Sequence, residues 1–341
     1  MLTSSQPPAF VPLARSPARF TSVLLIVNPG SRTGKQFLPA VLDALGDARV
    51  HVVETAAPRH ATAIVRDLLQ TNPGAFDSVL TLGGDGTAME VATALAEFTD
   101  APPLGIVARG TANILARTLG VPMNPADAIR ALREADIVAI DIGQVLNGPA
   151  FAIGLGIGLD ASMIAGASPA LKRRIGYLAY GISALRAGLK LERFRATITV
   201  DGAEHEVEAS SILIANFGTV LGDLVCFGED IGHQDGVLDV CIYSPRTYRD
   251  AVRIFWRMLR GGMSCDANVR ILRGHNIRVE TNPPRPMQAD GELIGFTPVD
   301  VRVTSGAVRV LVPRAAPRRW RVRLLPAARA TTDRLEIRKT P

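Results

Sequence analysis

Short apolar runs alternate with segments of helical period along the first part of the chain. Runs at 23–27, 51–54 and 78–82 predict β-strands, and the segments up to Leu45 and over 60–69 predict helices. This strand and helix order is typical of a parallel sheet covered on both faces. Ligands bind such sheets at the carboxyl ends of the strands, so the loops that follow strands are the candidate sites.

From about residue 140 the pattern changes to closely spaced strands separated by glycine-rich turns, which predicts a mostly β second domain. Its apolar runs lie at 151–157, 196–200, 211–215 and 237–243. Helical segments at about 170–191 and 247–259 interrupt these strands. The predicted fold class is therefore α/β, with an N-terminal α/β domain on a parallel sheet followed by the mostly β domain.

Composition narrows the class of protein. With 341 residues, 47% of them hydrophobic, the chain is long and apolar enough for two domains, which excludes disorder as its dominant state. No uninterrupted apolar stretch of about 18 residues occurs, so we expect no membrane-spanning segment. Residues 1–20 hold four prolines and no apolar core of the signal-peptide kind, which predicts an extended leader. Three cysteines at distant positions favour a reducing, cytosolic compartment: Cys226, Cys241 and Cys265.

The net charge of +6 belongs mostly to one end of the chain. Residues 314–341 hold eight Arg and one Lys against Asp333 and Glu336, so the rest of the chain is close to neutral. Aromatic residues make up only 5%, which disfavours a base-stacking surface. We therefore expect no nucleic-acid partner, and we expect the basic tail to favour anionic surfaces.

The first candidate loop, Asn28-Pro29-Gly30-Ser31-Arg32-Thr33-Gly34-Lys35, lies between a predicted strand and a predicted helix. Small residues there let backbone N–H groups approach an anion. Only three residues separate Gly30 from Gly34, and Gln36 follows the lysine, so the loop is not a Walker P-loop. A tight turn with a helix start is the alternative.

Two further glycine loops follow strands. Gly83-Gly84-Asp85-Gly86-Thr87 sets three glycines around one carboxylate, which leaves room for a triphosphate and a metal-linked acid. The alternative is structural, because Thr87 and Glu90 also have the spacing of a helix capping box. Gly110-Thr111-Ala112-Asn113 again ends a strand and opens a helix. Three such loops at one sheet edge predict a nucleotide site.

These motifs, in this order, resemble the diacylglycerol kinase catalytic-domain family, which includes bacterial lipid kinases and sphingosine kinases. The resemblance spans about residues 22–313. It rests on Asn28-Pro29 with Ser31 and Gly34, Gly83 to Thr87 with Glu90, Gly110 to Asn113 with Leu115-Ala116-Arg117, Asp235-Gly236-Val237-Leu238-Asp239, and Asp290-Gly291-Glu292.

The resemblance implies a NAD kinase/diacylglycerol kinase-like α/β domain and a β-sandwich domain, with ATP in the cleft between them. It also implies that the last strand, near 308–312, returns to the first domain. The expected organisation is a leader over 1–20, an α/β domain over 21–140 completed by 303–313, a β-sandwich domain with helical insertions over 141–302, and a basic tail over 314–341.

The activity implied by the resemblance is that of an ATP- and Mg²⁺-dependent lipid kinase of phospholipid metabolism, acting on diacylglycerol or a similar lipid. Glu292 matches the family's proposed general base and is assigned to catalysis together with Asp85. Asp235, with backbone oxygens of Gly232 and Val237, matches a structural magnesium site. The implied ATP contacts are Asn28, Pro29, Gly30, Ser31, Arg32, Thr33, Gly34, Thr55, Gly83, Gly84, Asp85, Gly86, Thr87, Ala88, Met89 and Thr111.

Three positions depart from the family pattern. Ile114 stands where many members have an acid, Met89 where an asparagine is common, and Arg32 where glycine is usual. The alternatives left open are a sphingosine-type or other lipid kinase, a NAD-kinase-like enzyme for a soluble substrate, and a non-catalytic lipid-binding regulator.

The segment 247–259 offers a way to reach a lipid. Helical spacing puts Val252, Phe255, Trp256 and Leu259 on one face and arginines largely opposite. Such a helix either packs its apolar face on its own domain or lies in an anionic membrane interface. We expect a cytoplasmic protein that associates peripherally with an anionic membrane surface, and the sequence leaves a homodimer open.

Overall fold

The computed structural model describes residues 20–30, 34–158, 192–220, 224–228, 230–260 and 266–314. The leader apart from Phe20, the basic tail apart from Arg314, and the insertion at 170–191 lie outside the described residues. So do three of the predicted ATP contacts, Ser31, Arg32 and Thr33, and also Cys265.

The first part of the chain forms the predicted parallel sheet. Its strands lie in the order β2-β1-β3-β4 and pair in parallel throughout. Their bounds are β1 (Ser22–Val27), β2 (Arg49–Glu54), β3 (Ser78–Gly83) and β4 (Leu104–Ala108). All residues of β3 and β4 are buried, as the continuous apolar runs predict for strands covered on both faces.

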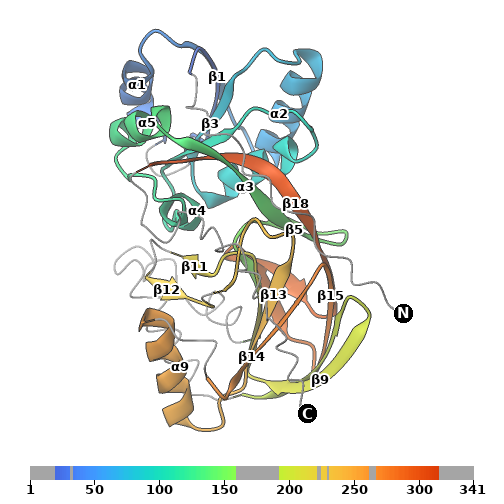
Figure 1. The fold of residues 1–341 in the computed structure, drawn as a ribbon. Helices are drawn as coiled ribbons and strands as arrows, with labels where there is room; N and C mark the ends of the chain where they lie inside the picture. Colours follow the sequence, from blue (N-terminus) through green and yellow to red (C-terminus); the bar gives the residue numbers. More distant parts are fainter. Residues whose placement is uncertain are drawn as a thin grey trace, which may run out of the picture.

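In the described part of the first domain, two pairs of helices cover the sheet, one pair on each face, and a fifth helix, α4, follows β4. The helix α1 packs against α5, and α2 packs against α3 (Figure 1). Asn124 begins α5 by accepting hydrogen bonds from the N–H groups of Ala126 and Asp127, which is a standard helix cap. The bounds are α1 (Gly34–Leu45), α2 (His60–Thr71), α3 (Asp85–Leu95), α4 (Ile114–Thr118) and α5 (Pro125–Arg133).

One long strand, β18 (Val299–Val312), joins the two halves of the molecule. At its end, Val310 pairs in parallel with Leu104 of β4. At its start it pairs in antiparallel fashion with β15 (Asn276–Asn282), and along much of its length with β5 (Asp136–Val145). The sheet therefore continues from β4 through β18 and β15 to β8 (Phe194–Val200) and β9 (Ala203–Ala209).

A second sheet of six strands, in the order β14-β13-β10-β7-β16-β17, completes the second domain. The strands are β7 (Gly154–Gly158), β10 (Ser211–Ala215), β13 (Leu238–Tyr243), β14 (Val269–Gly274), β16 (Pro286–Ala289) and β17 (Glu292–Phe296). One buried cluster takes Ile157 and Val240 from this sheet and Ile198 and Ile277 from the long sheet. The two sheets therefore form a sandwich, which confirms the predicted fold class.

Four further elements of the second domain lie in the described ranges. The helix α9 (Tyr248–Arg260) packs its buried Ile254 onto the other face of the six-stranded sheet, beside Cys241 and Tyr243. The strands are β6 (Ala150–Phe151), which pairs with β5, and the hairpin of β11 (Thr219–Val220) and β12 (Val225–Cys226). No helix in the described ranges is long and apolar enough to cross a bilayer.

Candidate active site

The loops after β1, β3 and β4 meet at one edge of the parallel sheet. Asn28, the first residue after β1, donates from Nδ2 to Oγ1 of Thr87 over 3.0 Å. Its Oδ1 accepts from the N–H of Gly30 at 2.9 Å. One side chain therefore fixes the turn of the first loop and ties it to the first turn of α3.

The second and third loops touch backbone to backbone. A Cβ placed on Gly110 would lie 2.7 Å from Cα of Gly84, closer than real Cβ atoms approach a backbone. The N–H of Arg109 donates to the carbonyl oxygen of Gly83 over 2.6 Å. Glycine at 110 is thus required by close approach, and a Cβ on Gly84 would crowd Cα of Gly110 at 3.2 Å. The two loops bring backbone together at the strand ends, where phosphates bind.

Two polar side chains of these loops, Asn113 and Asp85, accept hydrogen bonds from the loop backbone and so fix its conformation. Asn113, in the left-handed region with φ 51°, accepts from the N–H of Gly110 at 2.7 Å and donates to its carbonyl oxygen at 2.9 Å. Asp85 accepts from the N–H of Leu115 at 3.1 Å, which ties the second loop to the start of α4. Burial raises the pKa of Asp85, and the N–H groups at the start of α4 oppose that rise. Asp85 therefore has a structural partner besides any catalytic role.

The alternative interpretation of Thr87 and Glu90 as a capping box is wrong. The helix α3 begins at Asp85 with Gly84 as its cap residue, so Thr87 already lies inside the first turn. The Glu90 carboxylate instead accepts from the N–H groups of Arg59 at 2.8 Å and Ala61 at 3.0 Å, at the start of α2. Glu90 thus caps a helix distant in sequence, a pairing that local spacing does not indicate.

The remaining predicted ATP contacts differ in exposure. Ala88 is fully buried and Met89 packs against the core of the first domain, so both side chains anchor the first turns of α3 in that core. Thr55 is also buried, and its N–H donates to the carbonyl oxygen of Val27 at 2.8 Å, next to the first loop. Thr111 is exposed and lies in the third loop, shortly before α4.

The second domain reaches this edge through the turn between β16 and β17. A Cβ placed on Gly86 would lie 3.2 Å from Oε1 of Glu292, the first residue of β17. The turn itself uses left-handed backbone at Asp290 (φ 44°) and Gly291 (φ 93°). The structure therefore brings the predicted base Glu292 to the second glycine loop, although some 200 residues separate them in the sequence.

Asp290 anchors the turn that carries Glu292. Its carboxylate accepts from the N–H groups of Ala152, Ile153 and Gly154 at 2.7, 2.9 and 3.0 Å. Burial raises the pKa of Asp290 to about 6, the three N–H donors oppose the rise, and the charge of nearby Asp85 adds to it. Asp290 is thus a positioning residue that the sequence motif contained but did not assign.

The predicted magnesium ligands also lie together. Oδ2 of Asp235 would be 2.7 Å from a Cβ on Gly232, and Oδ1 of Asp235 accepts from the N–H of Val237 at 3.3 Å. Burial raises the pKa of Asp235, Arg273 opposes the rise, and Asp141 adds to it. Asp141 is itself held by the N–H groups of Gly236 and Gly306, each at 2.7 Å.

Asp235, Gly232 and Val237 offer oxygen ligands of the kind that Mg²⁺ or Ca²⁺ binds. The carboxylate oxygens of Asp235 are hard ligands, and Arg273, which opposes its charge, already forms an ion pair of 2.9 Å with buried Asp239. A divalent cation would offset the remaining carboxylate charge. Within the described ranges no cluster of three His, Cys, Asp or Glu side chains suits a metal, so such a site would rest on one carboxylate with backbone carbonyl oxygens.

Arg109 is a candidate functional residue that the sequence motifs do not indicate. Its guanidinium lies 4.3 Å from the ring centroid of Phe37, which belongs to the first turns of α1, and its Nε donates to the carbonyl oxygen of Ala108 at 2.8 Å. The described residues offer its two terminal nitrogens no acidic partner. Its position directly before Gly110 could have indicated this role, because an arginine between two glycine loops is well placed to bind phosphate.

Comparisons with known proteins match both domains. A model described as the diacylglycerol kinase catalytic domain matches residues 22–145, and one described as the YegS C-terminal NAD kinase beta sandwich-like domain matches residues 154–312.

Similar proteins cover most of the chain. A diacylglycerol kinase of Bacillus subtilis (strain 168) is 28% identical over 302 residues, which is 85% of this chain and 96% of the relative. An uncharacterised protein of Synechocystis is 31% identical over 261 residues, which is 74% of this chain, and the match spans 60% of that relative's length. The crystal structure of a "putative diacylglycerol kinase" from Bacillus anthracis is 26% identical, with a TM-score of 0.70, and covers 87% of this chain and 99% of that one.

Proposed function

Because this chain belongs to the diacylglycerol kinase catalytic-domain family, as its motifs predict, we propose that it is an ATP-dependent lipid kinase that phosphorylates a hydroxyl group of diacylglycerol or a closely similar lipid. The observation that carries the proposal is the approach of Glu292, from the second domain, to Gly86 in the second glycine loop. A carboxylate at that point can act on a hydroxyl directed at a phosphate held by the loops.

The first domain would hold the triphosphate. Phosphoryl transfer depends mainly on positioning and on stabilising charge on the phosphate oxygens, with little covalent chemistry from the protein. Backbone N–H groups of the glycine loops and the guanidinium of Arg109 supply these contacts. The link from Asn28 to Thr87 keeps the first loop in register with the second.

Glu292 would supply the base. The lipid oxygen forms a bond to the γ-phosphorus while the bond from that phosphorus to the β,γ-bridging oxygen breaks, so ADP leaves with the electron pair. The hydroxyl proton passes to the Glu292 carboxylate. Asp290 fixes the turn so that this carboxylate stays beside Gly86.

Magnesium would bind at Asp235 with carbonyl oxygens of Gly232 and Val237. There it would offset carboxylate charge and so stabilise the loop that follows Ile231, beside Asp141 and β18.

The surface beside Glu292 favours a lipid acceptor over a soluble one. Leu293 follows Glu292 directly in β17 and is 53% exposed. Phe296, the last residue of the same strand, is 65% exposed, and its pairing with Pro286 beyond a bulge places it on the face of Leu293. Exposed large apolar side chains next to a base suit an acyl chain better than a nucleotide acceptor.

Purified full-length protein, γ-labelled ATP and a panel of acceptors would test the proposal. The panel contains diacylglycerol and sphingosine dispersed in detergent, with NAD as the soluble acceptor. We expect label in diacylglycerol or a similar lipid and none in NAD. No labelled lipid despite intact ATP binding would leave the non-catalytic alternative, and label in NAD alone would replace the lipid kinase with a soluble-substrate enzyme.

A further inference from the structure

The helix α9 exposes an apolar stripe. Tyr248, Val252 and Trp256 follow one another at intervals of four residues, and 55%, 41% and 50% of their surfaces are exposed. Such spacing puts the three side chains on one face of the helix. Ile254 is the buried residue of this helix, so the face that packs on the domain is not the one that contains Val252 and Trp256.

Arginines without acidic partners flank this stripe. Both acids near α9 are engaged: Asp250 pairs with Arg253 at 2.8 Å, and Asp266 pairs with Arg253 at 2.9 Å and Arg257 at 3.5 Å. Arg246, Arg249 and Arg260 are exposed and form no ion pair within the described part of the chain. The guanidinium of Arg260 lies 5.0 Å from the ring centroid of Trp256, so a cation stands directly beside the stripe.

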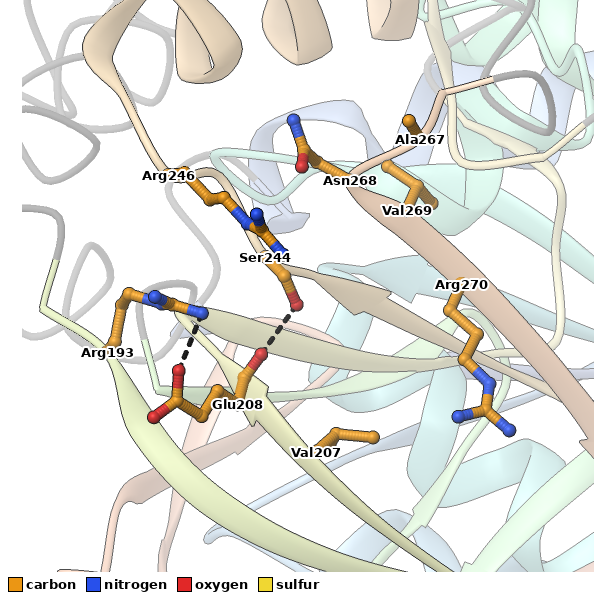
Figure 2. A pocket seen from close by; sticks show the side chains of 9 residues that line it. All are labelled: Arg193, Val207, Glu208, Ser244, Arg246, Ala267, Asn268, Val269 and Arg270. Carbon is orange, nitrogen blue, oxygen red and sulfur yellow. Dashed lines mark hydrogen bonds and ion pairs between the residues drawn. The ribbon is translucent and has the colours of Figure 1, made fainter.

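A basic cavity of about 350 Å³ adjoins the beginning of α9 (Figure 2). Arg193 and Arg246 lie on one side of the view and Arg270 on the other, with Ser244 and Asn268 between them. Its single acid, Glu208, is paired with Arg193 at 2.8 Å, which leaves the cavity with a positive charge. Arg246 belongs to both the cavity and the flank of the stripe.

The position of α9 connects this surface with the loops of the first domain. The helix packs on β12, β12 pairs with β11, and β11 packs on α4, the helix that follows the third glycine loop. These elements follow one another along the same side of the molecule in Figure 1.

We propose that α9 and the adjoining cavity form a docking surface for an anionic lipid bilayer. The stripe of Tyr248, Val252 and Trp256 enters the interface, and the flanking arginines and the cavity bind phosphate headgroups. Exposed aromatic and aliphatic side chains surrounded by unpaired cations have the chemistry of an interfacial helix. The purpose of the surface rests on the proposed lipid kinase function, but its existence does not.

Vesicle sedimentation of the full-length protein, without ATP or acceptor, tests the surface. The vesicles are phosphatidylcholine with and without phosphatidylglycerol. We expect binding to the mixed vesicles that weakens as salt rises. Arg246→Gln, Arg249→Gln and Arg260→Gln together should weaken binding about 100-fold, because each arginine near an anionic surface is worth about fivefold.

Matched variants control for charge and for lost apolar surface. Arg49→Gln, Arg130→Gln and Arg302→Gln remove the same charge from exposed positions on other elements and should leave binding within about twofold. Trp256→Ser should weaken binding about tenfold, whereas Leu146→Ser, at a site that is 65% exposed after β5, should not. Arg270→Gln, which changes a cavity residue outside α9, should weaken vesicle binding about fivefold.

Equal vesicle binding by the two triple variants would overturn the proposal. So would a Trp256→Ser protein that keeps full binding but changes from dimer to monomer, because the stripe would then contact a second copy of the chain. All variants should phosphorylate detergent-dispersed lipid at the wild-type rate. A wild-type protein that binds vesicles but transfers no phosphate would overturn the proposed function and leave the docking surface standing.

Discussion

The two domains contribute to the candidate site in different ways. In the first, the functional positions follow β1, β3 and β4 directly, because the carboxyl ends of neighbouring parallel strands meet at one edge. In the second, they lie in two separate segments: Asp235–Gly236 shortly before β13, and Asp290–Gly291 in the turn between β16 and β17. The turn brings Glu292 across to the first domain. The first domain thus surrounds the site with the backbone of its three loops, which we call the backbone cradle. The second domain contributes single carboxylates, whose positions depend on hydrogen bonds such as those of Asp290.

The sharpest test of the second domain's contribution is Glu292→Gln, for which we expect the largest effect. Removing a general base lowers turnover by about 10²- to 10⁴-fold. ATP affinity, measured by calorimetry, should stay unchanged, because the first domain holds the nucleotide. Glu204→Gln, an exposed change on β9, is the control. A Glu292→Gln enzyme that turns over normally would remove the second domain from the chemistry.

The anchoring of the turn should appear in the pH dependence of stability. The pKa of Asp290 is raised to about 6, so the folded state holds its proton more tightly than the unfolded state does. This stabilising contribution is complete only below about pH 3 and is lost as the pH rises through 6. Relative to Asp290→Asn, the wild-type free energy of unfolding should fall by about 2.5 kcal/mol from pH 4 to pH 7. Urea denaturation at each pH measures it, and a constant difference would contradict the burial of this carboxyl.

Gly110→Ala probes the backbone cradle of the first domain. A Cβ there would meet Cα of Gly84 at 2.7 Å, so the two loops must separate. We expect a loss of about 1–3 kcal/mol in unfolding free energy together with weaker ATP binding. Thermal shift with and without ATP reports both. An alanine variant with wild-type stability and affinity would mean that the contact between the loops is not required.

Arg109→Gln separates phosphate binding from the rest of nucleotide recognition. We expect ATP affinity to fall about tenfold, because a charge-assisted hydrogen bond is lost, and adenosine affinity to stay the same. Arg130→Gln, a surface arginine paired with Asp127, is the matched control. Parallel losses for ATP and adenosine would assign Arg109 to packing on Phe37 instead.

Gly86→Ala tests the junction between the two domains and should have the smallest effect. Its Cβ would lie 3.2 Å from Oε1 of Glu292, the movable end of a side chain, so the carboxylate can shift. We expect turnover to fall about fivefold, near 1 kcal/mol, with ATP affinity retained. A loss of ATP affinity without loss of turnover would show that the change disturbs the cradle and not the base.

The sequence predicts the parts of this molecule that depend on local chemistry. The three glycine loops were predictable because buried strands and their turn residues are adjacent in the chain. The role of Glu90 was not, because its partners at Arg59 and Ala61 lie about 30 residues away and are fixed by helix packing. Asp85 similarly finds its partner at Leu115 only after the second and third loops come together.

The second domain shows the same limit more strongly. Its strands were predictable from apolar runs, but the continuation of the long sheet through β18 depends on pairing with β4, β5 and β15, which no local pattern specifies. In α9 the apolar residues cover more than one face, so periodicity alone did not identify Ile254 as the packed residue. The domain boundaries, the ATP contacts and the magnesium ligands remain predictions.

A single-turnover reaction most directly tests the central claim that a base from the second domain activates a lipid hydroxyl for attack on a phosphate held by the first. Wild-type protein is loaded with γ-labelled ATP and mixed with a detergent-dispersed total lipid extract, and mass spectrometry follows the products. The account predicts one new lipid phosphomonoester that appears at the rate at which ADP forms. ADP formation with release of free phosphate and no phosphorylated lipid would contradict it.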